Sequence, residues 1–220
     1  VDAMGLQACT HGCADGGIRM IVNAYEYVRT VNPAWDARHR IDHCERPHPD
    51  DQPRLAALDI YAAMQPQHFF GDESVELVLG EERLKANMPW HSLLDLGVPL
   101  SFGTDWCAGP GNPVYGLLLA ATRLNYKQNT DWGPEEAISL EDGMRAFTIG
   151  SANALKMEQD VGSIEVGKYG DLPMFNTDLR RMTSLAFFLT HRVELGGLDD
   201  FVDMTVVGGR IVYARPHASL

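Results

Sequence analysis

Three side chains in this sequence combine the residue types and the placement that a divalent metal site needs. They are His11, His43 and Asp105, and each comes at or just after the end of a short apolar segment. Two imidazoles and a carboxylate are suitable protein ligands for zinc or a similar divalent ion. The three residues could therefore form one metal centre if the fold brings the ends of these segments together.

Each of these residues also has a simpler structural explanation. His11 could cap the following helix or hydrogen-bond a loop, and His43 lies in a polar Asp-His-Cys-Glu run. Asp105 could be a helix N-cap or a turn residue, because aspartate is common at both positions. Because all three residues lie at successive strand ends, the sequence supports the metal-site interpretation as well as it supports the structural one.

The elements that would position these residues follow from the apolar pattern of the chain. Four apolar segments are predicted to be strands, at residues 6–10, 40–43, 60–64 and 98–102. Helical patterns alternate with them, including residues 18–28, a helix capped by Asp50 or Asp51, residues 114–125, and a capping box that opens a helix over 139–149. This alternation predicts an α/β fold with a parallel sheet and right-handed crossovers. In a (β/α) barrel the carboxyl ends of such strands carry the active site.

The sequence changes character after residue 160. Short strands are predicted at 162–168, 172–175 and 204–213, the last containing a Gly208-Gly209 turn. Pro173 weakens the middle one, because proline cannot donate a hydrogen bond to a ladder. We therefore expect two domains, 1–160 with the parallel sheet and 161–220 with a separate small β-sheet.

Composition excludes several classes of partner. The 220 residues carry a formal net charge of −12 and contain no cluster of five or more basic residues, so neither nucleic acid nor a membrane surface is an expected partner. No apolar run is long enough for a membrane helix. The four cysteines form no C-x-x-C pair, which favours a reducing, cytoplasmic setting.

Six motifs in order resemble the C-terminal half of the metal-dependent amidohydrolase superfamily, specifically its amidohydrolase-3 (YtcJ-like) branch. They read "THGCADGGIRMIVNAYEYV", "RHRIDHCE", "AAMQPQHF", "SFGTDWCAGPGNP", "RAFTIGSANAL" and "VGSIEVGKYGDL", and the closing "TVVGGRIVYARP" is similar to the family's final strands. The resemblance covers almost the whole chain. It implies that the four strands are the fifth to eighth of a TIM (β/α)8 barrel and that the tail is part of a C-terminal β-sandwich.

The resemblance also implies roles for individual residues. His11 and His43 would be the metal-binding histidines after strands five and six. Asp105 would hold the metal, take a proton from the bound water and pass it to the leaving nitrogen. The implied activity is hydrolysis of carbon–nitrogen bonds in small-molecule, non-peptide amides. The implied cofactor is one or two divalent ions, with zinc as the first expectation.

Some residues depart from the family pattern, and others have more than one possible role. Cys13 is unusual beside His11, and a zinc or redox site of Cys9, Cys13 and His11 is a less favoured alternative. Gln65 and His68 match the family's "MQPxH" and are candidates to contact substrate or support the metal ligands. His68 could equally be a solvated loop residue. Trp106 could line the pocket, or it could have only a structural role in packing.

The larger departure is the absence of any His-x-His pair among the eight histidines, which the superfamily carries on its first strand. We therefore expect an incomplete fragment, without activity of its own. Half a barrel leaves two unpaired sheet edges, so we expect the N-terminal half or a second copy to cover them. The alternatives are a non-catalytic scaffold and a half-barrel that is active only in complex.

Overall fold

The parallel sheet predicted from the sequence forms the centre of the molecule. The computed structural model describes residues 1–69, 73–125, 130–131, 133–182 and 201–216. Four strands pair in parallel in the order in which they occur in the chain. They are β1 (Cys9–Gly12), β2 (Arg40–His43), β3 (Tyr61–Met64) and β4 (Leu100–Phe102). The α/β class with a parallel sheet is therefore confirmed.

The first strand begins three residues later than predicted. Ala8 donates its backbone N–H to Nδ1 of the buried His39 (3.0 Å), so it does not use this group in the ladder. The strand also ends later, because Gly12 accepts from the Cys44 N–H (2.9 Å), so His11 lies inside β1, paired in register with Asp42. His43 is the last residue of β2.

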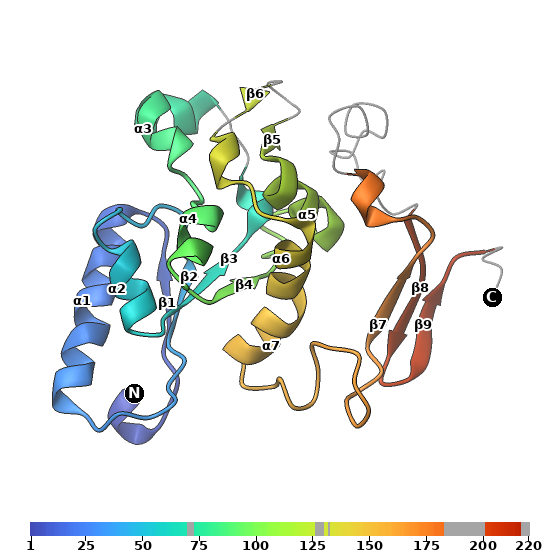
Figure 1. Cartoon of the computed structure of the whole chain (residues 1–220), viewed down its shortest axis with the longest axis horizontal. Helices are drawn as coiled ribbons and strands as arrows, with labels where there is room; N and C mark the ends of the chain where they lie inside the picture. Colours follow the sequence, from blue (N-terminus) through green and yellow to red (C-terminus); the bar gives the residue numbers. More distant parts are fainter. Residues whose placement is uncertain (70–72, 126–129, 132, 183–200, 217–220) are drawn as a thin grey trace.

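Helices follow the strands and cover the sheet (Figure 1). They are α1 (Asp15–Val31), α2 (Gln52–Ala57), α3 (Glu73–Lys85), α4 (Trp90–Asp95), α5 (Pro113–Thr122), α6 (Leu140–Arg145) and α7 (Ser151–Ala154). Short turns of other helix types lie at η1 (Asp2–Met4), η2 (Pro66–His68), η3 (Pro134–Glu136), η4 (Ala146–Gly150) and η5 (Leu179–Met182). None of the helices in the described ranges is long and apolar enough to cross a bilayer.

Two helix boundaries differ from the prediction. The helix expected over 114–125 ends at Thr122, because Arg123 takes a left-handed conformation with φ 53°. The Ser139 hydroxyl accepts from the Asp142 N–H as the capping pattern predicts. The helix then runs only to Arg145, where a π-type turn precedes α7. There the Ser151 hydroxyl donates to the carbonyls of Phe102 and Ala146 (both 2.8 Å), which ties this break to the end of β4.

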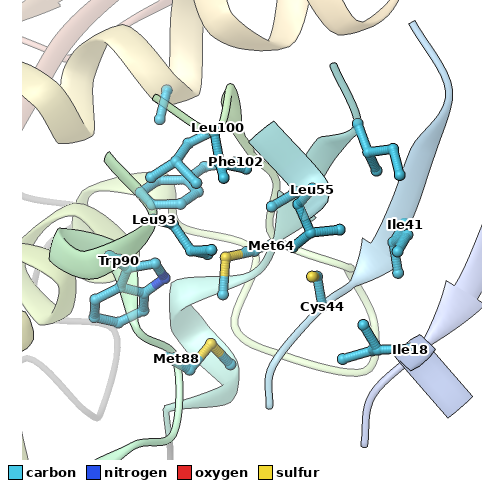
Figure 2. Close-up of a cluster of buried hydrophobic side chains, with 14 of the residues drawn as sticks. Ile18, Ile41, Cys44, Leu55, Met64, Met88, Trp90, Leu93, Leu100 and Phe102 are labelled. Carbon is cyan, nitrogen blue, oxygen red and sulfur yellow. The ribbon is translucent and has the colours of Figure 1, made fainter. Parts of the chain in front are cut away.

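The main core lies between the sheet and its helices. Figure 2 shows these side chains pointing toward one another from the strands and from α1, α2 and α4. Its members include Ile18, Ile41, Leu55, Met64, Met88, Trp90, Leu93, Leu100 and Phe102. Burial of side chains of this size contributes roughly 1.5–3 kcal/mol each, so this cluster fixes the strand ends in place.

A three-stranded antiparallel sheet follows the parallel one. It consists of β7 (Leu172–Phe175), β8 (Val202–Val207) and β9 (Arg210–Ala214), in that order. Pro173 lies on the edge strand β7, where a missing donor is tolerated. A second apolar cluster joins α5 to Phe175, Leu179 and Phe201. A short pair of strands, β5 (Leu124–Asn125) and β6 (Thr130–Asp131), follows α5 in the chain.

The predicted strand at 162–168 is wrong. These residues form bends and turns, and Gly162 and Gly167 adopt φ angles of 94° and 100°. These left-handed angles do not occur in an extended strand, and glycine reaches them without the Cβ clash of other residues.

Candidate metal centre

His43 occupies the carboxyl end of β2 with its ring held in a defined orientation. Its Nδ1 lies 2.8 Å from Oε1 of Gln65, the residue directly after β3. An amide oxygen can only accept, so Nδ1 carries the proton and Nε2 keeps a free lone pair. A metal-binding histidine is usually oriented in this way by a hydrogen bond to its other nitrogen.

His68 lies between two carboxylates. Its Nδ1 is 3.3 Å from Oε1 of Glu45, and its Nε2 is 3.5 Å from Oδ2 of Asp105. Glu45 is buried and also pairs with Arg46 at 3.1 Å. The Nε2 atom of His68 is buried and makes no hydrogen bond. Nδ1 of His68 can donate to Glu45, and its Nε2 makes no hydrogen bond. His68 is therefore available as a metal ligand or as a partner of Asp105.

The ligand atoms of His43, His68 and Asp105 all lie within 4.8 Å of one another. Asp105 follows β4 in a turn and adopts φ 50°, and His43 adopts φ 76°. Left-handed conformations are uncommon for residues other than glycine, and they concentrate at functional sites. One strand, one helical turn and one loop therefore deliver three metal-ligand groups to a single point.

His11 and Cys13 approach the same histidine from the other side. The rings of His11 and His43 are 4.5 Å apart at their centroids and lie edge to face. The Sγ atom of Cys13 is 3.5 Å from Nε2 of His11, and the ligand atoms of these two residues and His43 also lie within 4.8 Å of one another. Burial, with the nearby charge of Glu45, raises the pKa of the Cys13 thiol.

The structure thus brings together most of the residues that the sequence singled out. His11, His43 and Asp105 lie at one edge of the sheet, with Gln65 and His68 beside them. Trp106 is 76% exposed, and its ring packs over Gly111. Sequence reasoning missed Glu45, although it stands two residues after His43 in the Asp-His-Cys-Glu run.

A cavity of about 280 Å³ opens beside these groups. Its lining includes His43, Gln65 and Asp105, together with Arg40, Asp42 and Ser101. The Arg40 guanidinium pairs with Asp42 at 2.9 Å. The cavity is therefore polar next to the candidate ligands and large enough for a small molecule.

The donor set fits a divalent ion. In a tetrahedral site with ligand bonds of about 2.05 Å, two nitrogen or oxygen ligands stand about 3.3 Å apart. The 3.5 Å between His68 and Asp105 is close to this value, and histidine with carboxylate is a donor set that zinc accepts. The buried, unpartnered Nε2 of His68 gives such an ion a nitrogen to bind.

Comparison with known proteins supplies the family. The model of the amidohydrolase family matches residues 1–213, so the chain belongs to that family. LONG AFTER FAR-RED 3 of Arabidopsis thaliana is 35% identical over 80% of the chain and 31% of its own length. An N-substituted formamide deformylase of Arthrobacter pascens is 30% identical over 80% of the chain and 32% of its own length. The putative amidohydrolase YtcJ of Bacillus subtilis is 25% identical, over 96% and 38% respectively.

Solved structures show the same fold. A metal-dependent hydrolase from Pyrococcus horikoshii superimposes with a TM-score of 0.65 at 23% identity, covering 76% of this chain and 33% of that one. An amidohydrolase from Thermotoga maritima gives 0.65 at 19% identity, over 96% and 44%. The chain spans about a third of the length of LONG AFTER FAR-RED 3 and of the formamide deformylase.

Proposed function

We propose that this chain is part of a metal-dependent hydrolase that cleaves carbon–nitrogen bonds in small, non-peptide amides. The main support for this proposal is that His43, His68 and Asp105 converge at the carboxyl ends of the parallel strands. Membership in the amidohydrolase family supports it. Within the proposal the four parallel strands are strands five to eight of a (β/α)8 barrel. Residues 1–160 are its barrel portion, and residues 161–220 are part of a β-sandwich.

The proposed ligands are His11, His43 and Asp105, holding one or two divalent ions with zinc as the first candidate. A bound divalent ion lowers the pKa of water from about 16 toward 7 and polarises the scissile carbonyl. Gln65 keeps the Nε2 lone pair of His43 aimed at the site. Asp105 accepts the proton of the attacking water and delivers it to the leaving nitrogen. His68, braced by Glu45, stands 3.5 Å from Asp105 and holds that carboxylate in position.

The proposed substrates are N-substituted formamides and related small amides. The similarity to a formamide deformylase, at 30% identity, supports this choice. The cavity of about 280 Å³ admits a small molecule beside Asp105. All four cysteines are free, which supports the proposed reducing, cytoplasmic setting.

The proposal includes a covering partner for this chain. Large apolar side chains lie exposed on β9 and the end of β8, at Val207, Ile211, Val212 and Tyr213. Exposed apolar surface of this kind marks an interaction site. We assign the covering of this surface, and of the open edges of the four-stranded sheet, to the N-terminal half of the protein or to a second copy. A non-catalytic scaffold, or a half-barrel active only in complex, is the alternative.

A hydrolysis assay on the full-length protein and on the isolated 220-residue chain tests the proposed function. The full-length protein should bind one or two divalent ions and hydrolyse N-substituted formamides. Hydrolysis should disappear when a chelator removes the metal and should return on reloading. The isolated 220-residue chain should show no hydrolysis, because it supplies only part of the site. Undiminished turnover by the stripped full-length protein would reject a metal-dependent mechanism.

A further inference from the structure

Cys13 stands in a position that no assigned role explains. It follows β1 by one residue and is partly buried, and its sulfur faces Nε2 of His11. The same sulfur lies within 4.8 Å of the ligand nitrogen of His43. The other cysteines differ, since Cys9 and Cys107 are exposed and Cys44 is fully buried in the core.

The spacing of these atoms matches shared coordination. Zinc binds a thiolate at about 2.3 Å and an imidazole nitrogen at about 2.05 Å, so in a tetrahedral site the two ligand atoms stand about 3.6 Å apart. The distance between Cys13 Sγ and His11 Nε2 is 3.5 Å. A thiol–imidazole hydrogen bond has a similar length, so the distance alone fits both. A hydrogen-bonded pair does not require a third ligand group, and His43 supplies one, since its ligand nitrogen lies within 4.8 Å of the ligand atoms of His11 and Cys13.

His43 can serve only one ion. Gln65 occupies its Nδ1, so Nε2 is the single nitrogen available. The two clusters, one with Cys13 and His11 and the other with His68 and Asp105, share the residue His43. A centre built on His11, Cys13 and His43 uses both histidines of the proposed ligand set and adds a sulfur ligand to it, and Asp105 keeps its proposed proton-transfer role beside His68.

We propose that Cys13 is a thiolate ligand of the metal, completing a two-histidine, one-cysteine set with His11 and His43. This inference rests on the proposed function and deepens it by naming a ligand. A thiolate favours zinc, cobalt and cadmium over magnesium and manganese.

Cobalt(II) substitution of the full-length protein tests the ligand. A cobalt–thiolate bond gives an intense near-ultraviolet charge-transfer band that nitrogen and oxygen ligands do not give. The wild-type protein and Cys9→Ser should show this band, and Cys13→Ser should lose it. Affinity for zinc, measured against a competing chelator, should fall in Cys13→Ser by at least the ~10–100-fold seen when an outer partner of a metal ligand is lost.

Alkylation gives a second measurement on the unmodified protein. Bound zinc should slow iodoacetamide labelling of Cys13, whereas labelling of the exposed Cys9 should not change. The inference is overturned if the cobalt-loaded protein shows no charge-transfer band, or if the band persists in Cys13→Ser. If the cobalt-loaded protein still hydrolyses its substrate, the proposed function stands. If the protein binds no cobalt and hydrolyses nothing, both are overturned.

Discussion

At the residue scale, two of the candidate ligands have strained backbone conformations. His43, the last residue of β2, and Asp105, which follows β4, adopt left-handed φ angles of 76° and 50°. Each such conformation costs on the order of 1–3 kcal/mol and persists only where surrounding structure imposes it. The core behind β2 and β4 imposes it here, with Ile41, Leu100 and Phe102 buried.

Gln65 offers a residue-scale test of how His43 is oriented. Gln65→Leu removes the acceptor of the Nδ1 proton, so the ring loses its fixed tautomer and metal affinity should fall ~10–100-fold. Gln65→Glu keeps an acceptor and should retain most of the affinity. Chelator competition on both variants measures the difference. Equal affinities for Gln65→Leu and wild type would remove Gln65 from the site.

The sequence allowed part of this residue-scale picture to be predicted. The types and positions of His11, His43 and Asp105 at strand ends were visible as a pattern. The contact of Glu45 with His68 was not, because it joins residues 23 positions apart through the turn after β3. No local period signals such a contact. The convergence of Cys13 with His11 and His43 likewise depends on the turn between β1 and α1.

At the element scale, η2 and α5 together place His68. Gln67, the residue before it, is completely buried and donates from Nε2 to the Asn112 carbonyl (3.3 Å), just before α5 begins. Gly116 of α5 leaves room for this side chain, since a Cβ there would stand 2.5 Å from Gln67 Oε1. Helical propensity predicted α5 but gave no reason for a glycine inside it.

Replacing this glycine tests the coupling between the two elements. Gly116→Ala should destabilise the protein by about 1–3 kcal/mol, because the buried Gln67 has no free space to move into. It should also weaken metal binding by displacing His68. The matched control is Gly17→Ala in α1, where nothing lies within 4 Å, and helix propensity should make it neutral or stabilising by up to about 1 kcal/mol. Denaturant unfolding compares the two, and equal effects would contradict the packing argument.

At the scale of the whole molecule, alternation of strands and helices was enough to predict the parallel sheet. It failed for residues 162–168, where glycines that favour turns override an alternating apolar pattern. The exposure of β9 was equally invisible, since a strand pattern does not say whether its faces are covered, and all five residues of this strand are exposed. Within the proposed function, these residues are where the covering partner would pack.

The central claim is that Asp105 moves the proton in a metal-dependent hydrolysis. Asp105→Asn in the full-length protein keeps the shape of the side chain and removes its basicity. Turnover of an N-substituted formamide should fall by at least ~10²–10⁴-fold while much of the metal stays bound. Asp50→Asn, a change at an exposed carboxylate, should leave both unchanged. Near-normal turnover by metal-loaded Asp105→Asn would contradict the claim.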